Sequence, residues 1–174
     1  MLQKPLRQVI IRKAIDADIS MMQVFIFTHG INPWNFLPED GVKAHLSGIS
    51  SQMVQAYLAE VNGECIGFAS FYLGLPPSCQ KYEENQENQV AYLGEIVVHH
   101  DYVGQGIGSK LINTLKEHLI ANNITRLYAE RHADNISSSA LMKKTGFKVI
   151  DEYDDEQRRP TGTKKTVVTR LELS

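Results

Sequence analysis

The most restrictive feature of this sequence is a strand, a glycine-rich turn and a helix in direct succession. Residues 91–98 are almost all apolar, which is typical of a strand buried on both faces. The turn Gly104-Gln105-Gly106-Ile107-Gly108 follows it. A helix is then expected from about Gly106 to Asn122, because apolar residues recur at four-residue spacing, namely Ile107, Leu111, Leu115 and Leu119. This succession predicts a mixed α/β domain.

A glycine-rich turn between a strand and a helix can form an anion site. Glycines let the backbone approach phosphate oxygens, and the free N–H groups and dipole of the helix favour negative charge. The turn therefore predicts a phosphate or pyrophosphate ligand, with a purely structural tight turn as the alternative. A P-loop is disfavoured because Gly108-Ser109-Lys110 reverses the required order. A dinucleotide fold is disfavoured by the G-x-G-x-G spacing, although Glu130 stands where its ribose-binding acid would be expected.

The other segments predict short strands and helices around this unit. Apolar and β-branched runs predict strands at residues 9–12, 54–61, 65–72, 127–130, 149–153 and 166–173. Helices are expected after Asp16, from Glu39 to Ser47 and from Asp134 to Lys144. Asn62-Gly63 predicts a hairpin turn. The polar stretch from Lys81 to Asn88 is expected to be a mobile hairpin loop.

Composition limits the classes of function. Residues 1–174 are expected to form one domain, since domains usually contain about 100–200 residues. The formal net charge of −2 supplies no basic face for nucleic acid, and no apolar run approaches the ~20 residues of a membrane helix. No nucleic acid or membrane partner is therefore expected, and a cytoplasmic protein is the default. Cys65 and Cys79 are too few for a disulfide framework.

Two motifs resemble the GNAT superfamily of N-acetyltransferases. The stretch from Tyr92 to Leu111 resembles the coenzyme A-binding core of this family. The stretch from Asn135 to Phe147 resembles its second signature, an asparagine followed by a helix that ends in Gly-Phe. The resemblance covers about residues 91–150. It implies a mixed α+β fold with a central, mostly antiparallel sheet of about seven strands, about four flanking helices and a V-shaped cleft after the fourth strand.

The resemblance implies that acetyl-CoA lies along the fourth strand and the glycine turn. The backbone of Ile96, Val97 and Val98 would bind the pantetheine arm and the thioester. Seven consecutive residues would hold the pyrophosphate with their amides, namely Val103, Gly104, Gln105, Gly106, Ile107, Gly108 and Ser109. Asn135 would hydrogen-bond the coenzyme in the cleft. The Val97 or Val98 amide would stabilise the oxyanion.

Two residues depart from the family pattern on the cofactor side. Val103 stands where Arg or Gln is usual, so a polar side chain is missing there, for which Gln105 could partly substitute. Met142 stands where a tyrosine often protonates the departing coenzyme A. The tyrosines that could replace it are Tyr92, Tyr102 and Tyr128. Alternatively water supplies the proton, or none is needed, because a thiol pKa of about 8.5 makes the thiolate a tolerable leaving group.

An amine acceptor requires a base, because an alkylammonium group with a pKa near 10 must lose a proton before attack. Glu95 is one candidate, since a charged side chain in an apolar strand needs water or a partner; its alternative role is that of an exposed strand residue. Glu130 is the other candidate. Some GNAT enzymes that modify protein N-termini have a catalytic glutamate that resembles it. Glu95 and Glu130 are therefore the expected catalytic residues.

Other polar residues lie close to these segments. His99 and His100 are expected to be loop residues rather than metal ligands, because adjacent residues on a strand point to opposite faces; no metal is expected. His132 is expected at the surface, with an acid–base role as the alternative. Trp34 is expected either to line the acceptor pocket or to pack in the core. The segment from Asp154 to Pro160 is expected to be a solvated hairpin loop that can border the substrate.

The resemblance thus implies an N-acetyltransferase that moves an acetyl group from acetyl-CoA to a primary amine by direct attack in a ternary complex. The acceptors to consider are polyamines, aminoglycosides, amino acids and protein N-termini, and both a monomer and a homodimer are compatible with the sequence. The alternative is a coenzyme A-binding regulatory module that has lost catalysis. Val103 and Met142 favour this alternative, whereas the retained Glu95 and Glu130 disfavour it.

Overall fold

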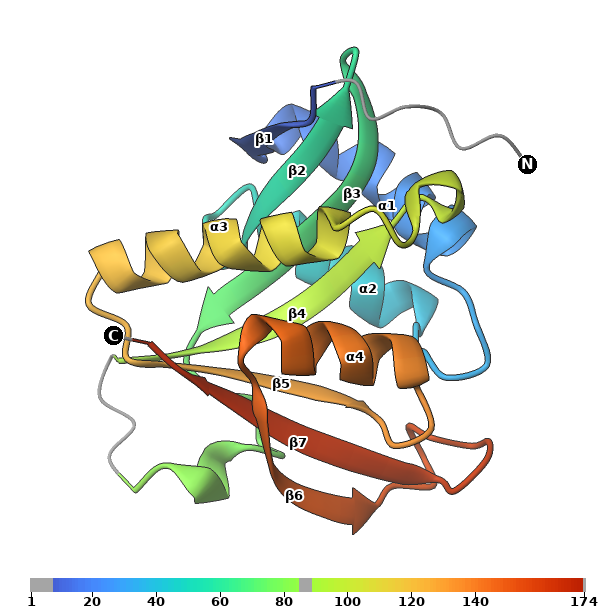
Figure 1. The fold of residues 1–174 in the computed structure, drawn as a ribbon, viewed down its shortest axis with the longest axis vertical. Helices are drawn as coiled ribbons and strands as arrows, with labels where there is room; N and C mark the ends of the chain where they lie inside the picture. The colour runs from blue at the N-terminus through green and yellow to red at the C-terminus, as the bar shows by residue number, and fades with distance from the viewer. Residues whose placement is uncertain (1–7, 85–88, 174) are drawn as a thin grey trace.

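The computed structural model describes residues 8–84 and 89–173, and within them seven strands form one sheet (Figure 1). Their order across the sheet is β1-β2-β3-β4-β5-β7-β6. The strands are β1 (Ile10–Lys13), β2 (Gln55–Val61), β3 (Glu64–Leu73), β4 (Val90–Val98), β5 (Arg126–His132), β6 (Lys148–Asp154) and β7 (Lys165–Glu172). All neighbours are antiparallel except β4 and β5, which run parallel. The predicted mixed, mostly antiparallel sheet is confirmed.

Helices cover both faces of the sheet and bury two apolar cores. In the described ranges they are α1 (Ile19–His29), α2 (Glu39–Ser47), α3 (Ile107–Ala121) and α4 (Ile136–Thr145). Figure 1 shows α3 and α4 in front of the sheet and α1 and α2 behind it. Alternation along β3 serves both cores, since Ala69 and Phe71 pack with α3 whereas Phe68 packs with α1 and α2. The centre of the sheet is therefore buried on both faces.

The strands β4 and β5 stay together only over their first residues. They pair from Val90 to Tyr92 on β4, in register with Arg126 to Tyr128 on β5. Beyond Tyr92 the two strands diverge, so the β4 edge that faces β5 has no strand partner as far as Val98. Its backbone N–H and C=O groups remain available to a ligand. The V-shaped cleft predicted after the fourth strand is present.

A bulge in β4 fixes a carboxylate at the wall of this cleft. Two residues of β4, Gly94 and Glu95, stand opposite the single residue Ser70 of β3. The Ser70 hydroxyl accepts the Glu95 N–H at 2.9 Å and pairs with His45 Nε2 at 2.8 Å. A Cβ at position 94 would lie 2.6 Å from the His45 ring, so this close approach requires glycine. The bulge and its two supporting side chains therefore set the position of Glu95.

The predicted elements are present with small shifts of their ends. The helix from Glu39 to Ser47 has the predicted limits, and Asn62-Gly63 joins β2 to β3 with both residues at positive φ. Asp16 lies in a short 3-10 helix that precedes α1, instead of capping α1. Part of the predicted mobile loop is ordered, because Gln80–Tyr82 form a 3-10 helix; residues 85–88 of that loop lie outside the described residues.

Among the described residues, no helix has both the length and the apolar character needed to cross a membrane.

Candidate active site

A cavity of about 800 Å³ occupies the place where β4 and β5 diverge. One wall is formed by residues 93–98 of β4 and another by residues 129–132 of β5. The lining also includes residues of the glycine turn and of α4, several residues between positions 29 and 37, and the pair Arg158 and Arg159. This volume lies within the range of small-molecule and cofactor sites.

The glycine turn presents free backbone donors to the cavity. Gly104 and Gly106 have φ angles of +81° and +80°, a conformation that favours glycine. No atom lies within 4 Å of a Cβ built at either position, so the space beside the turn is open. The first helical bond of α3 runs from the Lys110 N–H to the Gly106 carbonyl at 3.0 Å. The N–H groups of residues 107–109 therefore have no helical partner, as an anion site requires.

Replacing Gly106 by alanine should weaken coenzyme A binding and lower stability slightly. A Cβ in the left-handed region costs about 1–2 kcal/mol, and a turn that relaxes no longer aims its amides at a phosphate. Calorimetric titration with coenzyme A measures the effect. Gly63→Ala is the matched control, because Gly63 has a φ of +77° in the hairpin between β2 and β3. It should lose similar stability but keep full affinity; unchanged affinity in Gly106→Ala would contradict the assignment of the turn.

The residues expected to bind the cofactor gather at this cavity, with one exception. Those that line it are Ile96, Val97, Val98, Val103, Gly104, Gly106, Ile107, Gly108, Ser109, Asn135 and Met142. Gln105 does not line it. Its Nε2 donates to the Asp101 carbonyl at 3.5 Å, and its Oε1 is buried without a partner. The Gln105 side chain thus faces its own turn, where it cannot substitute for a polar side chain at position 103.

Strand alternation identifies the backbone groups of β4 that face the cleft. The His99 N–H donates to the Ile66 carbonyl of β3 at 2.8 Å. The N–H of Val97, two residues earlier, therefore also points toward β3, while the N–H and C=O groups of Ile96 and Val98 point into the cleft. This orientation corrects the expectation that the Val97 amide could stabilise an oxyanion.

Asn135 and Met142 stand on α4 and at its start. The Asn135 Oδ1 caps the helix by accepting the Ser138 N–H at 3.1 Å, and its Nδ2 has no hydrogen-bond partner among the described residues. That amide group is free to donate to a ligand in the cleft. Met142 is buried, and its sulfur accepts the Thr169 hydroxyl at 3.4 Å. It carries no proton that it could give to a leaving group.

Glu95 is a desolvated carboxylate at the cavity wall. Its side chain is half-buried, and its carboxyl group has no hydrogen bond or ion pair within the described parts of the chain. Burial raises the pKa of Glu95 to about 7, although the positive charge of Arg159 opposes this rise. A group with that pKa can take up a proton near neutral pH, which suits a general base.

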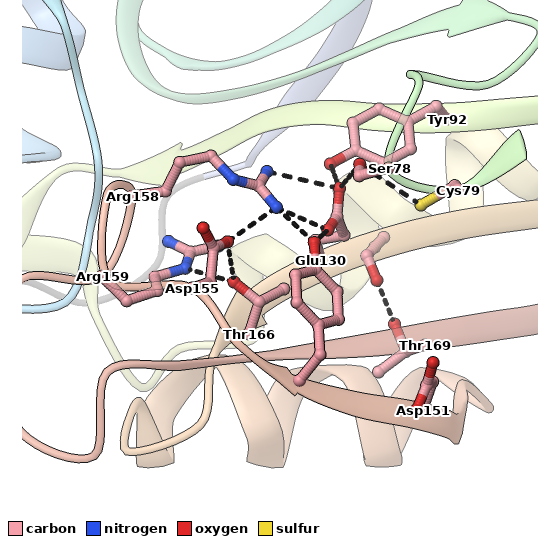
Figure 2. A network of polar contacts seen from close by, with 12 residues as sticks. Ser78, Cys79, Tyr92, Glu130, Asp151, Asp155, Arg158, Arg159, Thr166 and Thr169 are labelled. Carbon is pink, nitrogen blue, oxygen red and sulfur yellow. Dashed lines mark hydrogen bonds and ion pairs between the residues drawn. The ribbon is translucent and has the colours of Figure 1, made fainter.

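Glu130 is instead held as an anion by converging donors, most of which Figure 2 labels. Its side chain is only 1% exposed. The donors are Ser78 (2.7 Å), Tyr92 (3.0 Å), Tyr153 (2.7 Å) and Arg158 (2.9 Å). Burial alone would raise the pKa of Glu130, but the hydrogen bonds from Arg158, Tyr153 and Ser78 lower it to about 2. A carboxylate stabilised in this way is a poorer base than Glu95.

The segment predicted to be a solvated loop contributes a buried residue, Arg159, and a half-buried one, Arg158, so that prediction is wrong for its arginines. Arg158 pairs with Glu130 at 2.9 Å and with Asp155 at 2.8 Å. Arg159 is 8% exposed, and its Nε donates to the Thr166 hydroxyl at 2.9 Å. Both arginines line the cavity. The only sequence signal for this arrangement is the closeness of three acids to two arginines between Asp154 and Arg159.

His45 and Tyr72 also line the cavity, and the sequence patterns identified neither. His45 supports the bulge through Ser70, and burial lowers its pKa, so the neutral imidazole is favoured. Burial also raises the pKa of Tyr72 to about 12. Among the tyrosines considered as proton donors, Tyr92 and Tyr102 line the cavity. Tyr128 does not, since its hydroxyl donates to Glu83 at 2.5 Å.

The rings of His29, His99 and His100 pack together at the end of β4. The strand ends at Val98, so His99 lies in a loop as predicted, whereas His100 begins a 3-10 helix that ends at Tyr102; the argument from opposite strand faces therefore applies to neither. One nitrogen from each ring lies within 4.8 Å of the others. However, the ring centroids lie 4.0–4.7 Å apart, with His99 stacked on His100 and His29 tilted against both, and backbone N–H groups already donate to His29 Nδ1 and His99 Nδ1. Ring packing and hydrogen bonding account for the cluster.

His132 and Trp34 pack against each other, with ring centroids 4.8 Å apart. His132 is buried, which corrects the expectation of a surface residue. Its Nε2 lies 2.8 Å from the Thr161 carbonyl and its Nδ1 accepts the Asp134 N–H at 3.0 Å, so both nitrogens are engaged. Trp34 is partly buried and is not among the residues that line the cavity.

Comparison with known proteins agrees with this geometry. Aminoglycoside N(6')-acetyltransferase type 1 of Klebsiella pneumoniae is 28% identical over 102 residues, which are 58% of this chain and 51% of that protein. Spermine/spermidine N(1)-acetyltransferase of Bacillus subtilis is 30% identical over 93 residues, which are 53% of this chain and 58% of that protein. The matches thus span little more than half the length of these relatives.

The fold is also similar to that of solved structures. The crystal structure of the ribosomal-protein-S18-alanine N-acetyltransferase from Escherichia coli superposes with a TM-score of 0.74 at 19% identity, covering 96% of this chain and 95% of that one. The model of the acetyltransferase (GNAT) family matches residues 26–147, which include the cleft, the glycine turn and both sequence motifs. The chain therefore belongs to the acetyltransferase (GNAT) family.

Proposed function

We propose that residues 1–174 act as one N-acetyltransferase domain that moves the acetyl group of acetyl-CoA to a primary amine. Acetyl-CoA is the acetyl donor in this family. The observation that carries the proposal is that one cavity combines the open β4 edge, the free amides of the glycine turn and the carboxylate of Glu95. The first two features suit the donor, and the third suits the acceptor.

The residues of the cleft fit coenzyme A. The free N–H groups of residues 107–109 suit its pyrophosphate, and the cleft-facing backbone of Ile96 and Val98 suits the amides of its pantetheine arm. The free Nδ2 of Asn135 adds a donor. When bound, acetyl-CoA supplies an activated thioester. With the phosphates held at the turn, the β4 residues between the turn and Glu95 would hold the pantetheine arm and the thioester.

On the acceptor side, Glu95 takes the proton from the ammonium group, and the neutral nitrogen attacks the thioester carbonyl. The Ile96 N–H donates to the carbonyl oxygen as negative charge develops there, because Ile96 is closer to Glu95 than Val98 is. As the C–S bond breaks, the nitrogen of the new amide loses its remaining extra proton to water. Met142 has no proton to give, so coenzyme A leaves as a thiolate, which a thiol pKa of about 8.5 permits. Glu130 keeps the acceptor wall in place as a paired anion.

The acceptor is a primary amine of a small molecule or of a protein N-terminus. The two sequence relatives are named for aminoglycosides and for spermine and spermidine, which are small amines. Their names support an amine acceptor for this chain. The match to each spans only part of that relative, so the names do not choose among acceptors.

An assay of thiol release from acetyl-CoA across a panel of amines should show turnover, with calorimetry showing that coenzyme A binds. Turnover in the presence of an amine, with one N-acetyl product per thiol released, is the expected result. Binding without turnover for every amine would favour the inactive coenzyme A-binding module. Absence of binding would contradict the assignment of the cleft.

A further inference from the structure

Arg159 is a buried cation at the cavity wall that lacks an anionic partner. Its side chain donates to two neutral oxygens, the Thr166 hydroxyl at 2.9 Å and the Trp34 carbonyl at 3.4 Å. Within the described residues no carboxylate forms an ion pair with it, and its Nη2 has no hydrogen-bond partner. A buried charge is costly unless it is paired, so this guanidinium is suited to an anion that the protein itself does not supply.

Its neighbour Arg158 provides the contrast. Figure 2 shows the Arg158 guanidinium directed at Glu130 and Asp155, whereas Arg159 is directed at Thr166. Asp155 reaches Arg159 only indirectly, because the Thr166 hydroxyl donates to Asp155 at 2.6 Å and accepts from Arg159. Burial and the charge of Arg158 together lower the pKa of Arg159. The two acids near Arg159, Glu130 and Asp155, therefore both form their ion pairs with Arg158.

The charges that line the cavity also disfavour a polycation. The acids of the lining are Glu95 and Glu130, and Glu130 is neutralised by Arg158. The cations of the lining are Arg131, Lys144, Arg158 and Arg159. Only Glu95 is left to interact with a positively charged amine. A molecule with several ammonium groups would find one partner and several like charges.

Glu95 and Arg159 belong to the same cavity and influence each other electrostatically. When the amine of a small acceptor lies at Glu95, the rest of that molecule can therefore contact Arg159. We infer that the acceptor carries a carboxylate beside its primary amine, that Arg159 binds this carboxylate, and that amino acids are the substrate class. This inference rests on the proposed acetyl transfer for its chemistry, but the carboxylate site itself is a binding property.

The test compares amino acids with their carboxamides, which keep the amine and the side chain and lose the negative charge. Calorimetry on the complex with coenzyme A should show that the preferred amino acid binds at least about tenfold more tightly than its carboxamide. Spermine and an aminoglycoside serve as polycationic comparators. Equal binding of acid and amide across aliphatic, aromatic, acidic and basic side chains would overturn the inference, as would tighter binding of either polycation.

Variants locate the site. Arg159→Gln should weaken binding of the amino acid and leave binding of the carboxamide almost unchanged, so that the preference for the amino acid disappears. Arg159→Lys should keep part of this preference. Arg170→Gln is a matched control because Arg170 does not line the cavity, and it should keep the full preference. If Arg159→Gln does not fold, Arg159→Lys and the wild-type comparison still decide. An unchanged preference in a folded Arg159→Gln variant would overturn the inference.

The binding measurement separates this inference from the proposed function. If binding prefers a carboxylate in a way that depends on Arg159, but no amino acid is acetylated, the proposed acetyl transfer is contradicted and the carboxylate site is supported. If amines are acetylated without any preference for a carboxylate, the carboxylate site is contradicted and the acetyl transfer is supported. In the active enzyme, Arg159→Gln should raise KM for the amino acid more than it lowers kcat.

Discussion

Replacing Glu95 by glutamine should lower kcat at pH 7 by about 10²–10⁴-fold, because the variant keeps the shape of the side chain but cannot accept a proton. Coenzyme A affinity should change little, since the donor side of the cleft relies on the backbone of β4 and of the glycine turn. Steady-state kinetics with a saturating amine, together with calorimetric titration of coenzyme A, measure the two effects separately. A similar loss of kcat and of coenzyme A affinity would mean that Glu95 shapes the cleft instead of acting as a base.

The pH dependence makes the same prediction more specific. Wild-type kcat should rise through about pH 7 as Glu95 loses its proton, because only the ionised carboxylate is a base. Glu95→Gln should lose this inflection and recover activity at alkaline pH, where more of the amine is already neutral. Glu130→Gln is the matched control: the pKa of Glu130 is about 2, so the inflection near pH 7 should survive its removal. An inflection that persists in Glu95→Gln would identify another base.

The donor side of this site is predictable from the sequence because local backbone geometry creates it. Positive φ at Gly104 and Gly106, a helix that starts directly after them, and an asparagine that caps the next helix are all properties of short segments. The strand that precedes the turn is recognisable from its apolar run. Residue type and order are sufficient to predict such features, and the structure places them around one cleft.

The acceptor side is not predictable in this way, because its residues come from segments far apart in the chain. Glu130 has the residue type of a base, but four donors from other parts of the chain make it a stable anion, namely Ser78, Tyr92, Tyr153 and Arg158. A polar run such as residues 154–160 predicts exposure to solvent, yet Arg158 is half-buried against Glu130 and Arg159 is buried. The bulge at Glu95 likewise depends on Ser70 and His45, which no local pattern connects to it.

Replacing Arg158 by methionine should reduce the free energy of unfolding by about 3 kcal/mol at pH 7, because it leaves the Glu130 carboxylate buried without its cation. This value is at the lower end of the range for broken buried pairs, since the Arg158 side chain is 32% exposed. The wild-type contribution of Glu130 is present above its unfolded pKa near 4.5 and is lost as the pH falls toward about 2. In the variant the pKa of Glu130 rises, so the difference between the two proteins should shrink below about pH 4.

Urea unfolding of both proteins at pH 7 and pH 3 measures this difference. The matched control is the double variant Glu130→Gln/Arg158→Met, which removes the buried charge together with its partner and should recover much of the lost stability. Glu130→Gln alone should cost less than Arg158→Met, because the partly exposed Arg158 can still reach water and Asp155. A loss that is the same at both pH values, and that the double variant does not recover, would show that Arg158 stabilises the fold by packing, because a carboxylate that has lost its cation, Glu130 or Asp155, makes the loss depend on pH.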